Sequence, residues 1–484
     1  MTVETLRNYV GGRWVDSASL NHLEVTNPAT GEVLARVPLS TREEVDSAVR
    51  AARAAYPEWR ATAPLTRARY FFRLKDLLEE RFEDIARTLV REEGKTLDEA
   101  RGEVRRAIEC VEATTGIPSL MMGTCLEDAA KDIDTVAVRQ PIGVFAMLAP
   151  FNFPAMVPMW FLPFAVACGN TFIIKPSEQV PLCQMKILEA MDEVGFPPGV
   201  VNLVHGARDV AEALIEHPGV NGISFVGRSA VARQIYRRAA EFGKRVQALG
   251  GAKNFLVVMP DADLGRTVPA LITSCFGCAG ERCLSGSVIL AVGETYDPLQ
   301  RRVVDAASRL RVGDPLDETV QMGPVISRRH TERVLRYIDQ GLQEGAKLLL
   351  DGRGVIPAGS SNGYFIGATI FAEVRPEMTI AREEIFGPVI GIIPVRDLEE
   401  ALGIIRANEY GNTACIFTES GRSAAEFVYR AECSMLGINV GIAAPMAFFP
   451  FGGIKGSLFG DLKATGRAAI EFFTDTKVVI SRWR

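Results

Sequence analysis

Short apolar runs alternate with helical patterns between residues 171 and 258, and this alternation constrains the fold more than any other feature of the chain. Five runs rich in β-branched residues fit buried strands: Thr171–Lys175, Val200–Val204, Gly222–Val226, Val246–Leu249 and Phe255–Val258. Three segments between them have the apolar period of an α-helix: Leu182–Val194, Asp209–Glu216 and Ser229–Phe242. Parallel strands need a crossover that is usually a helix. The alternation therefore predicts a doubly wound parallel sheet of the α/β class.

A second series of the same kind follows toward the C-terminus. Its expected strands are Ser287–Val292, Ala368–Val374, Val389–Val395, Ala414–Thr418 and Leu436–Val440. Its expected helices run from about Pro298 to Leu310 and from Arg329 to Glu344. A chain of 484 residues accommodates two or three domains at roughly 150 residues per domain. Because no repeat or long linker separates the two series, two closely packed α/β domains are predicted.

The N-terminal part of the chain has a different pattern. Turn signals at Gly11-Gly12 and Asn27–Gly31 separate short alternating runs and predict a β-hairpin region. Ser40 and Glu43 have the spacing of a capping box, which predicts that a helix begins there. A continuous helical pattern follows from about residue 66 to residue 112, with apolar residues along one side. This part of the chain is predicted to be mostly helical.

The stretch from Gln140 to Ile174 contains no charged residue and is long enough to span a membrane. Five prolines interrupt it, at Pro141, Pro150, Pro154, Pro158 and Pro163. Asn152 and Asn170 also lie within it. Because proline breaks helices in their interior, the stretch predicts buried core beside a site and not a membrane span.

Charge and cysteine usage exclude several classes of protein. Lys and Arg number 54 against 59 Asp and Glu, and no basic block is present, so a nucleic-acid partner is not expected. Nine cysteines with few close pairs predict reduced thiols. With no signal peptide visible, a cytoplasmic location and no membrane partner are expected. The four histidines are scattered and Cys275–Cys278 is a lone CxxC pair, so no metal site is predicted.

The usual glycine-rich motifs for dinucleotides and phosphates are absent from the sequence. Two other turns are candidates. Phe225–Ser229 joins a strand to a helix, and the N–H groups at the start of a helix suit a pyrophosphate. Lys175–Glu178 places a cation and a carboxylate at the carboxyl end of a strand, where open α/β sheets bind ligands. The alternatives are a plain strand-to-helix junction and a capped helix start.

The segment Gly277–Cys283 combines small residues with a thiol beside a guanidinium. A neighbouring cation lowers the pKa of a thiol, so Arg282 is expected to raise the thiolate fraction of Cys283, as a nucleophile requires. The other interpretation is that Cys283 is a small buried hydrophobe, as most cysteines are.

Seven motifs have the order and spacing of the aldehyde dehydrogenase superfamily, which the chain resembles over essentially its whole length. They are Pro150–Pro154, Lys175–Glu178, Phe225–Gly227, Leu249–Gly251, Gly280–Cys283, Glu383–Pro388 and Pro450–Gly453. The resemblance implies a Rossmann-like NAD-binding domain at residues 1–118 and 142–250, and an α/β catalytic domain at residues 251–455. It also implies a homotetramer, with a small β oligomerisation element at residues 119–141 and 470–484.

The resemblance assigns a catalytic role to two residues. Cys283 is implied to attack the aldehyde carbonyl. The Asn152 amide and the Cys283 backbone N–H are implied to bind the oxyanion that results. Hydride transfer to a nicotinamide then leaves a thioester on Cys283.

The cofactor contacts are implied in the same way. Lys175 and Glu178 match positions that bind the adenosine ribose, where a carboxylate repels a 2′-phosphate, so NAD is expected over NADP. Glu384 and Phe386 match the contacts of the nicotinamide ribose. The other expected cofactor contacts are Phe151, Gly227 and Arg228. Arg228 replaces a small hydroxyl residue of the family, which leaves tolerance of a phosphate open.

The chain departs from the family where water would be activated. Hydrolytic members carry a glutamate directly before a Leu-Gly-Gly turn, whereas this chain has Gln247-Ala248 before Leu249–Gly251. A second carboxylate of the family matches Ala464. A general base contributes about 10²–10⁴-fold, so without one the thioester is expected to persist for another acceptor, coenzyme A.

Within the superfamily, the chain is most similar to the CoA-acylating methylmalonate-semialdehyde dehydrogenases. The motifs that carry this similarity are Ala149–Pro154, Gly243–Gln247, Gly251–Asn254 and Ala444–Pro450. In that subfamily two arginines bind the substrate carboxylate, and they match Arg106 and Arg282. The alternative for Arg106 is an exposed charge on a helix.

These features together predict NAD-dependent, CoA-acylating oxidation of methylmalonate semialdehyde or malonate semialdehyde. The products would be propionyl-CoA or acetyl-CoA, with loss of CO2. Departures from the subfamily at Arg228, Phe255 and Leu284 leave the preferred semialdehyde open. Two alternatives are a hydrolytic NAD(P)-dependent dehydrogenase of another acidic aldehyde, and a catalytically silent structural or binding member of the fold.

Overall fold

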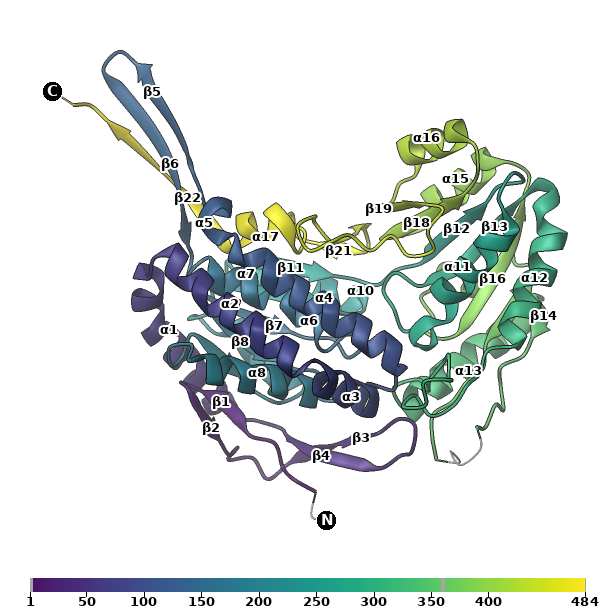
Figure 1. The fold of residues 1–484 in the computed structure, drawn as a ribbon, viewed down its shortest axis with the longest axis horizontal. Helices are drawn as coiled ribbons and strands as arrows, with labels where there is room; N and C mark the ends of the chain where they lie inside the picture. Colours follow the sequence, from purple (N-terminus) through teal and green to yellow (C-terminus); the bar gives the residue numbers. More distant parts are fainter. Residues whose placement is uncertain (1–2, 358–361, 484) are drawn as a thin grey trace.

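Two β-sheets organise the computed structural model, which describes residues 3–357 and 362–483 (Figure 1). Within these residues the first sheet has the strand order β2-β1-β9-β8-β7-β10-β11-β21. Strands β9, β8, β7, β10 and β11 run parallel, and β1 and β21 pair antiparallel with its ends. The strands are β1 (Asn8–Val10), β2 (Arg13–Val15), β7 (Val144–Leu148), β8 (Thr171–Lys175), β9 (Val201–Leu203), β10 (Gly222–Val226), β11 (Arg245–Leu249) and β21 (Leu458–Phe459).

Helices cover both faces of this sheet because its strands are apolar on both sides. Along β7, Val144, Ala146 and Leu148 pack on one face, and Phe145 and Met147 on the other, as the two-residue period of a strand requires. The first face packs against α1 (Arg42–Ala61), α9 (Arg208–Glu216) and α10 (Ser229–Glu241). The second packs against α2 (Pro64–Glu80), α4 (Leu97–Thr115), α6 (Met156–Met159), α7 (Leu162–Ala167), α8 (Leu182–Val194) and α17 (Gly466–Phe473).

The second sheet has the order β14-β15-β16-β13-β12-β18-β19 and is parallel except at β14. Its strands are β12 (Asn254–Val258), β13 (Gly286–Val292), β14 (Lys347–Leu350), β15 (Thr369–Ala372), β16 (Val389–Val395), β18 (Thr413–Phe417) and β19 (Met435–Ile438). Its helices are α11 (Leu264–Phe276), α12 (Tyr296–Ser308), α13 (Arg328–Gln343), α14 (Thr379–Arg382), α15 (Leu398–Ala407) and α16 (Gly421–Arg430). Two short turns of 3₁₀-helix are Gly277–Gly280 and Gly293–Thr295. A small sheet pairs β17 (Tyr410–Gly411) with β20 (Ile454–Lys455).

The doubly wound α/β architecture predicted from the sequence is confirmed. Strands β8, β10 and β16 and helix α8 begin and end at the predicted residues, and the other predicted elements of the two series differ by one or two residues at their ends. Strand β7 and helices α11, α15 and α16 were not predicted.

The N-terminal helices differ from the prediction in two ways. The single helix expected from residue 66 to residue 112 is three helices, α2, α3 (Phe82–Glu93) and α4. Gly94 ends α3 in the left-handed conformation (φ 95), and Thr96 begins α4 with a capping box. The first capping box lies at Thr41 and Glu44, because the Ser40 hydroxyl is buried in a hydrogen bond with Asn8. The predicted hairpin region is present as β1 with β2 and β3 (His22–Thr26) with β4 (Val33–Pro38).

The uncharged stretch from residue 140 to residue 174 is core, as predicted. It forms β7, α6, α7 and most of β8, and its buried apolar side chains belong to the cores on the two faces of the first sheet. Among the described residues, no helix is both long and apolar enough to cross a membrane.

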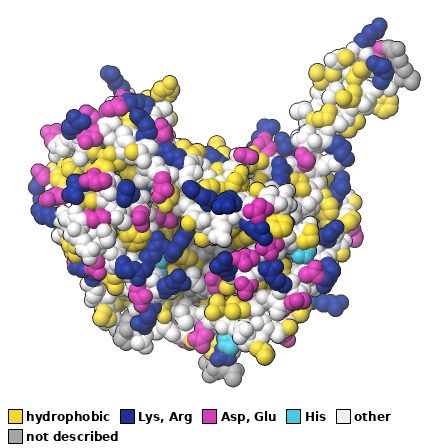
Figure 2. Space-filling model, turned by 180° about the vertical axis from the view of Figure 1, so that it is seen from behind, with side chains coloured by type: hydrophobic (Ala, Val, Ile, Leu, Met, Phe, Trp, Pro, Cys, Tyr) yellow, Lys and Arg dark blue, Asp and Glu magenta, His cyan; other side chains and the backbone are white. Residues whose placement is uncertain are grey.

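A three-stranded arm projects from the body of the molecule (Figure 1). It consists of β5 (Thr124–Ala130), β6 (Ile133–Pro141) and β22 (Thr474–Ser481), and α5 (Ile117–Leu120) precedes it. β22 pairs with β6 along its whole length, from Thr474 opposite Pro141 to Ser481 opposite Asp134. Figure 2 shows hydrophobic side chains along this arm, and Leu126, Val478 and Ile480 are among its exposed residues. The two segments predicted to form an oligomerisation element thus pair with each other, while their role in assembly stays a prediction.

Candidate active site

Two cavities meet at Cys283. The first has a volume of about 760 Å³ and is lined by α4, α11 and the chain that follows β19. The second has a volume of about 700 Å³ and lies at the carboxyl ends of β7, β8 and β10. Cys283 lines both cavities. A thiol in this position can react with a molecule in one cavity beside a second molecule in the other.

The turn before Cys283 has an unusual backbone. Cys278 (φ 47), Ala279 (φ 49) and Gly280 (φ 75) lie in succession in the left-handed region, which residues other than glycine rarely adopt. A Cβ at Gly280 would clash with the carbonyl of Gly387. Strained backbone of this kind persists only where its surroundings fix it, and it clusters at functional sites.

Two asparagine side chains fix the backbone of Cys283. The Asn254 amide donates to the carbonyl of Cys283 at 2.9 Å and to that of Ser285 at 2.8 Å. The Asn412 amide donates to the same Cys283 carbonyl at 2.8 Å. Sequence analysis noted Asn254 only as part of a motif and missed Asn412. Because amides are uncharged and polar, a sequence pattern does not distinguish them from turn residues.

The pKa of the Cys283 thiol lies above the ordinary value of a cysteine. Burial raises its pKa to about 12, and the nearby Glu384 carboxylate raises it further, whereas its backbone surroundings and Arg282 lower it. Arg282 does lower the pKa of Cys283, but burial raises it by more. The expectation that Cys283 is largely a thiolate is therefore wrong. Burial outweighs the cation because the Arg282 guanidinium is already paired elsewhere.

This raised pKa predicts how Cys283 responds to pH. In the protein without substrate, alkylation of Cys283 by iodoacetamide should accelerate about tenfold per pH unit from pH 7 to pH 10, because the thiolate is the reacting form. A free cysteine, whose pKa is about 8.5, should level off within that range. Peptide mass spectrometry after timed alkylation measures the rate. A plateau below pH 8 would contradict the raised pKa.

Asn152 lies in the loop after β7 and borders the second cavity. Its side-chain amide donates one hydrogen bond to the carbonyl of Glu281 at 3.0 Å. An amide NH₂ group has two N–H donors, so this bond fixes the amide and leaves the second N–H to serve another acceptor. The bond also ties the Asn152 loop to the strained turn that carries Cys283.

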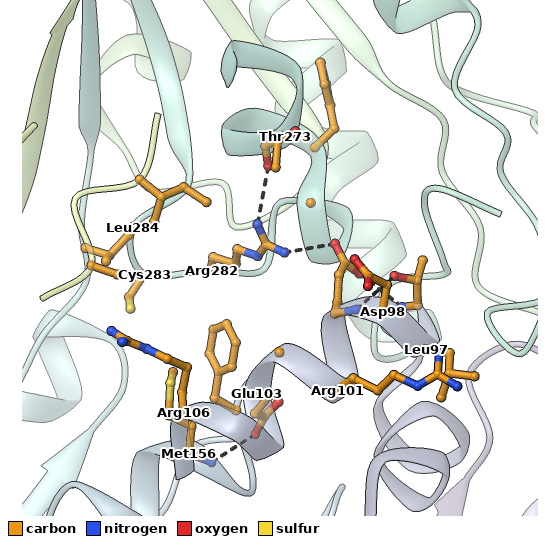
Figure 3. A pocket seen from close by; sticks show the side chains of 18 of the residues that line it. Leu97, Asp98, Arg101, Glu103, Arg106, Met156, Thr273, Arg282, Cys283 and Leu284 are labelled. Atoms are coloured by element: carbon orange, nitrogen blue, oxygen red, sulfur yellow. Dashed lines mark hydrogen bonds and ion pairs between the residues drawn. The ribbon is translucent and has the colours of Figure 1, made fainter. Parts of the chain in front are cut away.

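Arg106 belongs to the cavity wall and is not merely a surface charge. It lines the first cavity, and its side chain is 28% exposed. Its guanidinium pairs with Glu109 at 2.9 Å and donates to the Pro445 carbonyl. In Figure 3 it points toward Cys283. The adjacent Arg105 lies on the opposite side, where it pairs with Glu79 on the surface.

Arg282 also lines the first cavity, but its guanidinium is held by protein groups. It pairs with Glu99 at 2.9 Å and donates to the Cys278 sulfur at 3.2 Å and to the Thr273 carbonyl at 3.3 Å. Figure 3 shows Arg282 turned toward Thr273 and away from Cys283. The structure thus brings both predicted arginines to one cavity; both guanidinium groups have protein partners, and Arg106, 28% exposed against 14% for Arg282, is the more open to a ligand.

The second cavity gathers every residue predicted to bind the cofactor: Phe151, Lys175, Glu178, Gly227, Arg228, Glu384 and Phe386. The Lys175 ammonium is buried and contacts Glu178 at 3.2 Å and the Gly206 carbonyl at 2.7 Å. Helix α10 begins at this cavity, and no side chain caps its first turn. Its N–H groups and dipole therefore remain available to an anion.

His330 is a further residue of the second cavity that sequence analysis set aside. Burial lowers its pKa to about 4, so its imidazole is neutral. Its Nε2 lies 2.6 Å from the carbonyl of Phe386, a residue that adopts a left-handed conformation (φ 63). The close contact requires Nε2 to carry the proton and to donate to that carbonyl. His330 thereby fixes Phe386 against the cavity.

The positions at which hydrolytic relatives carry a base hold no carboxylate. Ala248 packs in the core, and the Gln247 side chain donates to the carbonyls of Leu462 and Lys463. Ala464 is buried and pairs through its backbone with Phe451. Gln247 therefore joins β11 to the C-terminal segment.

Comparisons with known proteins identify the family of the chain. The model of the aldehyde dehydrogenase family matches residues 14–479. The chain is 50% identical over 481 residues to malonate-semialdehyde dehydrogenase 3 of Geobacillus kaustophilus, covering 99% of each chain. It is 48% identical to malonate-semialdehyde dehydrogenase of Halalkalibacterium halodurans, covering 100% of this chain and 99% of the relative.

Solved structures give the same result. A methylmalonate-semialdehyde dehydrogenase from Oceanimonas doudoroffii superposes with a TM-score of 0.98 at 43% identity, covering 100% of this chain and 99% of the other. A crystal structure from Sinorhizobium meliloti 1021, named for methylmalonate-semialdehyde dehydrogenase and complexed with NAD, has a TM-score of 0.98 at 42% identity with the same coverage. Both the family model and these relatives span nearly the whole chain, and the chain belongs to the aldehyde dehydrogenase family.

Proposed function

We propose that this protein oxidises methylmalonate semialdehyde or malonate semialdehyde with NAD and transfers the acyl group to coenzyme A. The observation that carries the proposal is Cys283, which lies between a cavity bordered by Arg106 and a cavity bordered by the expected cofactor residues. Relatives about half identical are named for malonate semialdehyde, and two structural neighbours for methylmalonate semialdehyde. We propose residues 1–118 and 142–250 as the NAD-binding domain and residues 251–455 as the catalytic domain.

The residues of the second cavity fit NAD. The cavity opens at the carboxyl ends of parallel strands, the usual ligand position in such sheets. Lys175 and Glu178 would hold the adenosine ribose hydroxyls, and the start of α10 would face the pyrophosphate. The Glu178 carboxylate disfavours the 2′-phosphate of NADP. When bound, NAD supplies the acceptor for a hydride.

Catalysis begins when the Cys283 thiol gives its proton to water in the cavity and the sulfur bonds to the aldehyde carbon, whose π-bond electrons move to the oxygen. The carbonyl oxygen becomes an oxyanion, which the free N–H of Asn152 and the Cys283 backbone N–H stabilise. When the oxyanion reforms its carbonyl, the carbon loses a hydride and a thioester remains on Cys283. One oxyanion donor typically contributes about 10²–10³-fold to the rate.

The thioester needs an acceptor other than water. No carboxylate occupies the positions of Ala248 and Ala464, so water at the thioester lacks the general base of hydrolytic relatives. The thiol of coenzyme A can exchange with Cys283, which restores the enzyme thiol and releases an acyl-CoA. The carboxylate of the malonyl or methylmalonyl group lies β to the new carbonyl and leaves as CO2; the electron pair of the broken bond forms an enolate of the thioester, which takes up a proton from water. The products are acetyl-CoA and propionyl-CoA.

The substrate carboxylate is proposed to bind Arg106. Arg106→Leu should raise KM for a carboxylated semialdehyde by about 10- to 100-fold, since hydrogen bonds to charged groups contribute roughly 1.5–3 kcal/mol. KM for propanal, which has no carboxylate, should stay the same. Arg105→Leu is the matched control, because it removes a neighbouring guanidinium that points away from the cavity. Equal losses on both aldehydes would refute the role of Arg106.

We propose that the protein is cytoplasmic and assembles as a homotetramer. All nine cysteines are free thiols, as a reducing compartment maintains. The arm formed by β5, β6 and β22 exposes apolar side chains along a projecting sheet. Exposed apolar surfaces of this kind mark protein interfaces.

The decisive experiment measures NADH formation from each semialdehyde with and without coenzyme A, followed by mass analysis of the product. CoA-dependent formation of propionyl-CoA or acetyl-CoA is the expected result. A free acid formed at the same rate without CoA would place the protein among hydrolytic dehydrogenases of acidic aldehydes. Absence of turnover with every aldehyde, together with an unreactive Cys283, would support a catalytically silent member of the fold.

A further inference from the structure

One face of α4 contacts three parts of the proposed active site. Glu99, Glu103 and Arg106 are spaced so that they share a side of the helix. Glu99 accepts a hydrogen bond from the Cys278 N–H at 2.6 Å, in the turn before the nucleophile. Glu103 accepts from the N–H groups of Ala155 and Met156, at 2.7 and 3.1 Å. Helix α4 therefore contacts the turn before Cys283 and the loop of Asn152, and it also carries Arg106.

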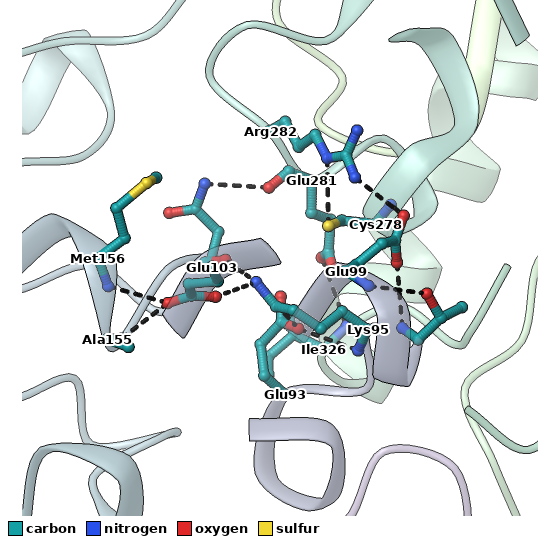
Figure 4. A network of polar contacts seen from close by, with 12 residues as sticks. Glu93, Lys95, Glu99, Glu103, Ala155, Met156, Cys278, Glu281, Arg282 and Ile326 are labelled. Atoms are coloured by element: carbon teal, nitrogen blue, oxygen red, sulfur yellow. Dashed lines mark hydrogen bonds and ion pairs between the residues drawn. The ribbon is translucent and has the colours of Figure 1, made fainter. Parts of the chain in front are cut away.

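Lys95 completes this arrangement from the segment just before α4. Its side chain is fully buried, and its Nζ contacts the Glu103 carboxylate at 2.5 Å. The same Nζ donates to the Asn152 carbonyl at 2.8 Å. It also lies 4.1 Å from the centre of the Phe153 ring. Figure 4 shows Lys95 and Glu103 together, with Glu103 directed at Ala155 and Met156.

The ion pair therefore holds the loop of Asn152 at two points, at Asn152 itself and where α6 begins. Lys95 binds the carbonyl of Asn152, and Glu103 binds the N–H groups three and four residues later. This loop lies between β7 and α6 and has no strand ladder of its own to fix it. Buried ion pairs often contribute little net stability, because both charges lose their hydration. We therefore expect this pair to matter more for the position of the loop than for the stability of the fold.

We propose that Lys95 and Glu103 are positioning residues, whose buried ion pair fixes the Asn152 loop so that the free amide N–H faces the oxyanion formed at Cys283. The inference rests on the proposed roles of Asn152 and Cys283. It does not depend on the identity of the semialdehyde or on coenzyme A. Lys95 and Glu103 themselves touch neither the thiol nor the amide, and act through the backbone of the loop.

The test uses the double variant Lys95→Met/Glu103→Gln. Removing Lys95 alone leaves the buried Glu103 carboxylate without its cation, which can prevent folding. Lys95 also lies 3.7 Å from the buried Glu93 carboxylate, but burial raises the pKa of Glu93 to about 7, so this group can take up a proton in either variant. In the double variant the glutamine amide that replaces the Glu103 carboxylate keeps an oxygen that accepts from Ala155 and Met156, but the donor to the Asn152 carbonyl is lost. Lys244→Met is the matched control, because it removes a lysine that also donates to two backbone carbonyls, those of His217 and Val220, outside both cavities. Circular dichroism and thermal melting establish that each variant is folded.

Two activities of the full-length protein are compared with coenzyme A present as the acyl acceptor: propanal oxidation with NAD, and release of p-nitrophenol from p-nitrophenyl acetate. We expect kcat of both to fall by about 10- to 100-fold in the double variant, the scale of loss when a catalytic group is displaced. KM for propanal should change little, and alkylation of Cys283 by iodoacetamide should keep its rate. Lys244→Met should retain both activities. An unchanged kcat in the folded double variant, or a matching loss of thiol reactivity, would overturn the proposal.

A double-mutant cycle separates positioning of Asn152 from a general structural effect. In an Asn152→Ala background there is no amide to position. Adding Lys95→Met/Glu103→Gln to it should therefore lower the rates by less than about twofold more, which indicates strong coupling. Independent losses that multiply would overturn the proposal. The p-nitrophenol released in the first turnover, when the ester acylates Cys283, reports on Asn152 and Cys283 even if the enzyme makes no acyl-CoA. A failure of the proposed function is thus distinguishable from a failure of this inference.

Discussion

Cys283→Ala is expected to abolish NADH formation from every aldehyde, with a loss of about 10⁵-fold or more, the scale seen when the nucleophile of a catalytic unit is removed. The reason is geometric as well as chemical. Cys283 lines both cavities, so its thiol is placed to reach an aldehyde on one side and face a cofactor on the other. The other thiols do not combine this position with access. Absorbance of NADH under saturating aldehyde measures the loss.

The matched control is Cys125→Ser, which removes an exposed thiol on β5, outside both cavities. It should keep full activity. Binding of NAD to Cys283→Ala, measured by calorimetry, should persist because the proposed cofactor contacts come from other residues. A rate near that of the unsubstituted protein would contradict the role of Cys283, and a loss of NAD binding would indicate a collapsed site.

Asn152→Ala is expected to lower kcat by about 10²–10³-fold, the usual effect of removing one oxyanion donor. Its amide is buried, and one N–H is already committed to the Glu281 carbonyl. The second N–H thus acts from a fixed position, and its hydrogen bond to an oxyanion is charge-assisted and therefore strong. Single-turnover NADH formation with propanal measures the effect on the step that includes hydride transfer.

The rate at which iodoacetamide alkylates Cys283 distinguishes this role from damage to the nucleophile. That rate should be unchanged in Asn152→Ala. Asn202→Ala serves as a matched control, since it also removes a buried amide that donates to a carbonyl, here that of Gly199. A similar fall in kcat in both variants would refute a specific role for Asn152.

The sequence predicted the fold well where polar residues interrupt apolar runs. Strands β8 and β10 end at charged or glycine residues that mark their ends, so their bounds were predicted closely. Strand β7 lies in a stretch without charge, where no period separates strand from buried helix. The helix expected across residues 94–96 is broken because Gly94 is left-handed and Thr96 begins a new helix. A pattern of apolar side chains does not register such a break.

The sequence identified residues that line the two cavities, while their roles stay predictions. It did not predict the charge environment of Cys283. Cys283 and Arg282 are adjacent in sequence, which suggested an activated thiolate. In the folded chain Glu99 takes the guanidinium and burial dominates the thiol. The roles of Lys95 and His330 were not predicted because each contacts the backbone carbonyl of a residue far away in the chain, Asn152 and Phe386. Such partners leave no local signature in a sequence.

The strand order of the first sheet has a consequence for synthesis of the protein. β21 pairs with β11 and β22 pairs with β6, although residues 458–481 follow the entire second sheet in the chain. On the ribosome, β11 and β6 therefore each keep one unpaired edge while the second sheet is translated. Unpaired strand edges are templates for aggregation. Domains usually fold in turn as they emerge. Here the unit that begins first is completed last, so a nascent chain truncated before residue 458 should remain prone to aggregate even with its second sheet fully formed.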